Sequence, residues 1–134
     1  MLFRSALVPM KNFWNLMYTG QIGIGQPAQL FDVVIDTGSA DLWVFSAQTA
    51  AAKQSYIHYY DSALSTSYVA PSPAVPWQIA YGQGTCQGFL SSDIVSLGDL
   101  FTRQVFAETT VFSSNFNNPD EPMDGILEIG RAHV

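Results

Sequence analysis

Positive charge and long apolar segments are both scarce in this chain. Five Lys and Arg stand against 11 Asp and Glu among 134 residues, giving a formal net charge of −6. Such a surface is not expected to attract phosphate backbones or anionic lipid heads, which argues against a nucleic-acid partner. Apolar runs such as residues 33–35 and 42–45 are far shorter than the roughly 20 residues of a spanning helix. No membrane partner is therefore expected.

Cysteine and histidine are also too few to suggest special chemistry. Cys86 is the single cysteine, so an intrachain disulfide is excluded. His58 and His133 do not combine with it into a metal-ligand spacing, and we expect neither a metal nor another cofactor. The first nine residues carry one Arg and a short apolar run without a cleavage-site pattern, so no signal peptide is predicted.

What the chain does contain is a series of short alternating segments. Its length and 48% hydrophobic content suit one globular domain. A hairpin is predicted from residues 18–25 and 30–35, a helical turn within residues 59–68 capped by Asp61 or Ser62, and loops at 46–55 and 113–122. Further strands are predicted at residues 42–45, 77–81, 89–97, 104–107 and 126–129. The pattern indicates an all-β barrel or sandwich.

The glycines in residues 23–28 imitate a dinucleotide-binding fingerprint. That motif needs a helix after the glycines, because the helix N-terminus binds the phosphates. Here residues 30–35 are apolar, aromatic and β-branched, which predicts a strand. A hairpin turn is the better interpretation.

The most informative motif is Asp36-Thr37-Gly38-Ser39, which follows an apolar strand. All four are turn residues, so the motif alone also fits an ordinary capped turn. Its surroundings add weight, because Trp43 lies shortly after it and residues 81–84 form a separate glycine-containing hairpin tip. Together these segments closely resemble the pepsin-like aspartic proteases.

The resemblance covers nearly the whole chain and corresponds to one lobe of that family. It implies a bilobal β-barrel-type fold of which residues 8–134 form an incomplete N-terminal lobe, preceded by a short extension at residues 1–7. A second Asp-Thr/Ser-Gly is absent from the sequence. We therefore expect a missing C-terminal lobe as partner, a peptide or protein as substrate, and no homodimer.

The resemblance also implies roles for individual residues. Asp36 would be the catalytic carboxylate of an aspartic-type endopeptidase, and its pair would activate a water molecule at acid pH. Thr37, Gly38 and Ser39 would support the active-site loop. Tyr81, Gly82 and Gln83 would form a flap over the substrate, with Trp43 behind the tyrosine. A secreted or lysosomal, acidic location is implied for the parent enzyme.

Two features depart from the family pattern. The solitary Asp-Thr-Gly predicts that this chain alone is inactive. Glu128 stands where the family pattern has glycine, so its bulk and charge require solvent or a partner. An alternative function is therefore an inactive fragment or peptide-binding homologue that keeps the cleft without cleaving.

Overall fold

The computed structural model describes residues 10–13, 17–36 and 41–128, which fold into strands and two short 3-10 helices. No α-helix occurs within these residues. The strands are β1 (Met10–Phe13), β2 (Met17–Ile24), β3 (Gln29–Asp36), β4 (Leu42–Phe45), β5 (Pro76–Tyr81), β6 (Gly84–Leu97), β7 (Leu100–Phe112) and β8 (Gly125–Glu128). The 3-10 helices are η1 (Ser62–Leu64) and η2 (Ser114–Phe116).

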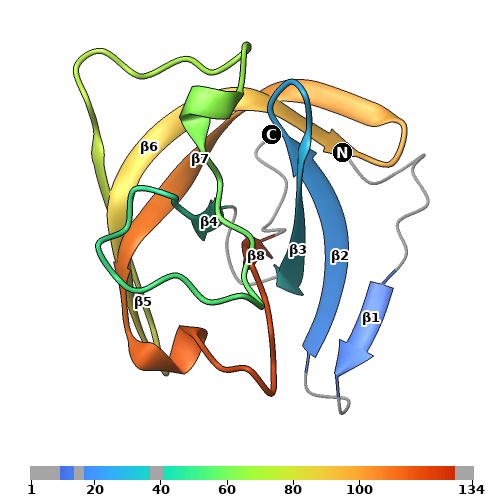
Figure 1. The fold of residues 1–134 in the computed structure, drawn as a ribbon, viewed down its shortest axis with the longest axis vertical. Helices are drawn as coiled ribbons and strands as arrows, with labels where there is room; N and C mark the ends of the chain where they lie inside the picture. Colours follow the sequence, from blue (N-terminus) through green and yellow to red (C-terminus); the bar gives the residue numbers. More distant parts are fainter. Residues whose placement is uncertain (1–9, 14–16, 37–40, 129–134) are drawn as a thin grey trace.

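All these strands belong to one mixed sheet that closes into a barrel. Its order is β1-β2-β3-β8-β4-β7-β6-β5, and an additional pairing of β2 with β6 joins six of the strands into a ring. The β3–β8 and β4–β7 pairs are parallel and the other pairs antiparallel. Figure 1 shows the long, bent β6 and β7 on one side and β2 and β3 on the other. The expected all-β barrel is confirmed.

Strand β4 is buried on both faces and separates two apolar clusters. Leu42 and Val44 face the first cluster, and Trp43 and Phe45 face the second. Successive strand residues point to opposite faces, which explains this division. The first cluster consists of Ile22, Ile24, Phe31, Val33, Leu42, Val44, Tyr60, Val95, Leu97 and Phe106. The second consists of Trp43, Phe45, Ile57, Cys86, Ala107, Phe116, Met123 and Ile126.

Most predicted elements are present, with corrected ends. Residues 25–28 form the turn between β2 and β3, so the hairpin interpretation is confirmed and no helix follows the glycines. Asp61 caps η1 by accepting a hydrogen bond from the Ala63 amide at 3.0 Å, as expected. The predictions for β6 and β7 were too short, because cross-strand pairing continues from Cys86 to Phe112 beyond the alternating core.

Candidate active site

Asp36 is the last residue of β3, and the neighbouring β8 fixes its position. The two strands run parallel, with Val33 opposite Gly125 and Asp36 opposite Glu128. Paired residues of adjacent strands project their side chains from the same face of a sheet. The carboxylates of Asp36 and Glu128 therefore leave the sheet side by side.

A buried carboxylate holds β3 to the chain entering β8. Asp124 is 2% exposed, and its Oδ2 accepts a hydrogen bond from the Asp32 amide at 2.6 Å. The Asp124 amide donates in return to the Asp32 carbonyl at 2.8 Å. This reciprocal pair lies four residues before Asp36, so it fixes the register of the strand that presents the candidate catalytic group.

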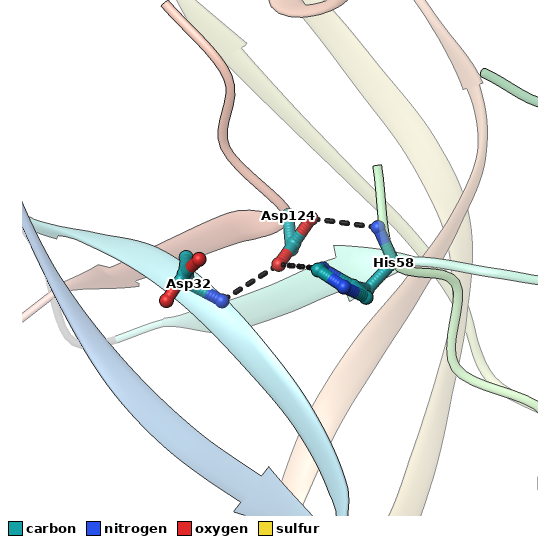
Figure 2. A network of polar contacts seen from close by, with 3 residues as sticks. All are labelled: Asp32, His58 and Asp124. Carbon is teal, nitrogen blue, oxygen red and sulfur yellow. Dashed lines mark hydrogen bonds and ion pairs between the residues drawn. The ribbon is translucent and has the colours of Figure 1, made fainter. Parts of the chain in front are cut away.

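The same carboxylate also binds the long segment between β4 and β5. Its Oδ1 accepts from the His58 amide at 2.7 Å, and the His58 Nδ1 lies 2.9 Å from its Oδ2. Figure 2 shows Asp124 between Asp32 and His58. Burial raises the pKa of Asp124, and the bonds from His58 and Asp32 limit that rise.

Gly125 permits β8 to lie close to β4. A Cβ atom at this position would stand 2.0 Å from the Trp43 carbonyl oxygen, well inside van der Waals contact. Only glycine leaves room for this approach of two backbones. The close packing sets β8, and with it Glu128, directly beside the strand that carries Trp43.

The hairpin of β5 and β6 brings an aromatic hydroxyl to the same place. Tyr81 pairs with Gly84 around the two-residue turn of Gly82 and Gln83. Its hydroxyl accepts a hydrogen bond from Trp43 Nε1 at 2.9 Å and donates one to Glu128 Oε1 at 2.6 Å. Burial, followed by the bond to Glu128, raises the pKa of Tyr81 above its ordinary value. The phenol is therefore neutral and able to donate.

Trp43 is held in place by aromatic packing as well as by this bond. Its side chain has no exposed surface. The ring makes edge contacts with Phe45 and Phe116, at centroid distances of 5.3 and 5.9 Å. Such perpendicular contacts are favourable for aromatic pairs. The indole N–H therefore points at Tyr81 from a rigid base.

A pocket of about 220 Å³ lies between the hairpin tip and the end of β3. Its lining mixes apolar side chains from β3, η2 and β8 with polar ones, and the polar surface is the larger part. The lining residues are Val34, Asp36, Tyr81, Gln83, Asn115, Phe116, Glu121, Met123 and Ile126. Asp36 and Tyr81 thus line the same cavity.

Comparison with known proteins decides the family. The model of the eukaryotic aspartyl protease family matches residues 17–134. The chain belongs to the eukaryotic aspartyl proteases. It is 42% identical to sheep (Ovis aries) renin over 109 residues, which are 80% of this chain and 27% of renin.

Two further relatives in this family match almost the full chain. Phytepsin of Hordeum vulgare is 41% identical over 130 residues, which are 96% of this chain and 25% of phytepsin. Vacuolar protease A of Neurospora crassa is 42% identical, with 95% of this chain and 32% of that protein covered. The aspartyl protease chain thus spans about a quarter to a third of the length of these curated relatives.

Within this family assignment, the structure places five of the eight expected site residues. Asp36, Tyr81 and Gln83 line the pocket, and Trp43 contacts Tyr81 from behind. Gly82 lies at the tip, where an added Cβ would meet no atom within 4 Å. The other three expected residues, Thr37, Gly38 and Ser39, lie outside the described residues.

Several residues that line the pocket were not found from the sequence. Phe116, Met123, Asn115 and Glu121 come from a segment predicted only as polar loop and from its end. An aromatic residue inside a polar stretch was the available signal for Phe116. The partner of Glu128 could not be found, because it lies 47 positions away on the hairpin tip.

Other reactive groups of the chain do not suggest further chemistry. Burial raises the pKa of Cys86 to about 12, so its thiol stays protonated and unreactive at neutral pH. Among the described residues, no group of three His, Cys, Asp or Glu side chains is arranged to hold a metal ion. In the same residues, no helix is long and apolar enough to cross a bilayer.

Proposed function

We propose that this chain is the N-terminal lobe of an aspartic endopeptidase that hydrolyses peptide bonds at acid pH. Asp36 supplies one of two catalytic carboxylates. The observation that carries the proposal is the position of Asp36, at the end of a strand and lining one pocket with the hairpin residue Tyr81. The family assignment supports the reaction class.

The reaction needs a second carboxylate, which another lobe contributes. The two groups share one proton and hold a water molecule between them, because like charges so close do not both ionise. The ionised group takes a proton from the water as its oxygen attacks the peptide carbonyl carbon, and the protonated group donates to the carbonyl oxygen. The group that took the water's proton then passes it to the nitrogen as the C–N bond breaks, and the other group takes a proton from the diol. This yields an acid and an amine and restores the pair with one shared proton.

The remaining site residues position the loop and the substrate. By the family resemblance, Thr37 and Gly38 would hold the active-site loop, and Ser39 would donate a hydrogen bond to the Asp36 carboxylate. The tip residues Gly82 and Gln83 offer backbone groups to an extended peptide, which binds as an added strand. The pocket offers both apolar and polar contacts to a side chain beside the bond to be cleaved.

The location of the whole enzyme follows from the same assignment. A carboxylate pair that shares a proton works in acid, so a secreted or lysosomal compartment suits it. The name of the Neurospora crassa relative places that protein in a vacuole. We extend an acidic compartment to the present chain on this ground.

A second candidate function is peptide binding without cleavage. Glu128 favours it, because this buried carboxylate stands at the position paired with Asp36, where the family resemblance led us to expect glycine. A chain of this kind would keep the pocket and the hairpin tip. It would bind peptides and leave them intact, whichever lobe accompanied it.

Inhibitor binding tests the role of Asp36 in the chain as it exists. We expect a pepstatin-type peptide, whose hydroxyl imitates the attacking water, to bind the purified chain weakly at pH 4. The change Asp36→Asn should weaken this binding about tenfold, the effect of losing a charged hydrogen-bond partner. Isothermal calorimetry with the matched control Asp99→Asn, a change in the exposed β6–β7 turn, measures it. Equal affinities of the wild type and Asp36→Asn would sink the assignment.

Cleavage separates the two candidate functions. The full-length transcript should continue into a second Asp-Thr/Ser-Gly segment, and its product should digest an unfolded protein at acid pH. The Asp36→Asn form of that product should show no digestion above background. A full-length product that binds the inhibitor and never cleaves would establish the binding function instead.

A further inference from the structure

Glu128 is a buried carboxylate on the strand next to Asp36. It is 5% exposed and ends β8 opposite Asp36. Its backbone amide donates to the Asp41 carbonyl at 2.8 Å, which ties the end of the strand to the start of β4. Burying a carboxylate is unfavourable unless polar partners compensate for the lost water. The contacts of its side chain therefore carry information about its role.

The hydroxyl of Tyr81 provides such a contact, and the direction of the hydrogen bonds can be assigned. An indole N–H can only donate, so the Tyr81 oxygen accepts the 2.9 Å bond from Trp43. The single hydroxyl proton is then left for Glu128 Oε1, at 2.6 Å. The chain of donors runs from Trp43 through Tyr81 to Glu128, and each bond polarises the next.

These hydrogen bonds join the tip of the β5–β6 hairpin to strands β4 and β8. Tyr81 is the last residue of β5 before the turn, whereas Trp43 and Glu128 lie on the neighbouring strands β4 and β8. An added Cβ at Gly82 would meet no atom within 4 Å. On the other side of the turn, the Thr85 amide donates to Ser113 Oγ at 2.9 Å. The tip is therefore open at Gly82 and is held on one side at Thr85 and on the other at Tyr81.

We propose that Glu128 is a positioning residue that holds Tyr81 down and keeps the hairpin tip closed over the pocket before any ligand binds. That this hairpin is a flap over a peptide site rests on the proposed function. The hydrogen bond between Tyr81 and Glu128 does not depend on it. An incoming peptide strand would have to lift the tip and break the bond to Glu128, so the residue restrains access to Asp36.

Hydrogen exchange of the hairpin in the unliganded chain tests this restraint. We expect Glu128→Leu, which keeps an apolar bulk and removes the acceptor, to speed amide exchange in residues 78–87 about 10- to 100-fold, the factor for losing a hydrogen bond to a charged group. Glu128→Gln retains an acceptor oxygen and should restore most of the protection. Mass spectrometry of fragments covering β5 and the start of β6 gives the rates.

A double-mutant cycle shows that the effect passes through the hydroxyl. Tyr81→Phe should speed exchange as Glu128→Leu does, and the double variant should add little to either one. Tyr68→Phe, outside the hairpin, is the matched control and should leave residues 78–87 unchanged. Exchange in residues 91–97 serves as the internal reference for global stability.

Three results would overturn the proposal. They are unchanged hairpin exchange in Tyr81→Phe, additive effects in the double variant, and Glu128→Gln exchanging as fast as Glu128→Leu. If Glu128→Leu does not fold, Glu128→Gln and Tyr81→Phe still decide the question. Because no ligand is present, failure here is distinct from failure of the Asp36 assignment, which inhibitor affinity measures.

Discussion

Asp93 is a charged residue without exposed surface in the wall of an apolar barrel. Its carboxylate accepts hydrogen bonds from the hydroxyls of Tyr60 at 2.6 Å and Ser65 at 2.7 Å on Oδ2. Ser67 and the Ile94 amide donate to Oδ1 at 2.5 and 2.7 Å. Burial acts to raise the pKa of Asp93, but these donors outweigh it and lower the pKa below its ordinary value of 3.8.

We expect Asp93→Asn to reduce the free energy of unfolding by about 2 kcal/mol at pH 7, because an amide replaces one acceptor by a donor. Because the pKa of Asp93 is lower in the folded chain, its ionised form stabilises the fold at pH values above 3.8, the pKa in the unfolded chain. This stabilisation is lost as the pH falls through the pKa of the folded chain. The difference between wild type and variant should therefore shrink at pH 3. Urea denaturation at both pH values measures it.

The control for this change is Asp99→Asn, since Asp99 is exposed in the β6–β7 turn. That substitution should alter stability by less than about 0.5 kcal/mol. A difference between Asp93→Asn and wild type that stays constant from pH 7 to pH 3 would contradict the role assigned to the ionised carboxylate.

At the scale of single residues, the sequence predicts those with a local signature. Asp36, Tyr81 and Trp43 lie in segments whose order along the chain is characteristic, and the structure brings them together. The partner of Glu128 has no such signature. From the sequence we expected that Glu128 would need solvent or a polar partner. Its partner Tyr81 is 47 positions away, and only the fold brings the two side chains together.

At the scale of elements, β8 is a short strand paired along both of its edges. It lies between β3 and β4, parallel to one and antiparallel to the other. Gly125 lies where β8 closely approaches β4. A Cβ atom added at Gly125 would be 2.0 Å from the Trp43 carbonyl oxygen. A flexible side chain could move aside, but the Trp43 backbone is held by its own pairing to β7.

We expect Gly125→Ala to reduce the free energy of unfolding by more than about 4 kcal/mol, because β4 and β8 would have to separate. Thermal unfolding followed by circular dichroism would show a much lower midpoint or no cooperative transition. Gly82→Ala is the matched control, since an added methyl group meets no atom within 4 Å there. Similar midpoints for both alanine variants would show that the strands can accommodate a side chain.

Element prediction succeeds where the local pattern is alternating and bounded by turn residues. The β2–β3 hairpin, β4 and the β5–β6 tip are of this kind. The prediction stopped short in β6 and β7. Residues 84–88 contain two glycines, residues 100–103 and 108–112 mix polar and apolar side chains, and these segments are strands through their mutual pairing. The insertion of β8 between β3 and β4 has no local signal at all.

At the scale of the whole molecule, buried acids shape the response to pH. Glu108 has no exposed surface, and burial raises its pKa, although hydrogen bonds from Ser91 and Ser46 limit the rise. Burial also raises the pKa of Asp124, and hydrogen bonds from His58 and Asp32 limit that rise. A raised folded pKa favours the folded state when the group is protonated. That stability is fully present at pH values below the pKa of the unfolded chain, and it is lost as the pH rises through the pKa of the folded chain.

We therefore expect Glu108→Gln to become more stable relative to wild type as the pH rises above 4.5, the ordinary value for this side chain. Gln keeps an acceptor oxygen for one serine and removes the charge that must be buried. Midpoints of thermal unfolding from pH 4 to pH 8 measure the effect. Parallel curves for wild type and variant would contradict it, and the exposed change Asp120→Asn is expected to give such parallel curves.

The position of β8 also governs the order in which the barrel can be made. On the ribosome β3 and β4 emerge early, yet they are not paired with each other, because the strand between them begins only at Gly125. Until that strand has been synthesised, the edges of β3 and β4 offer open hydrogen-bonding groups to any other chain. In the nascent protein the candidate catalytic strand β3 therefore keeps one unpaired edge until β8, the last described strand, has been synthesised.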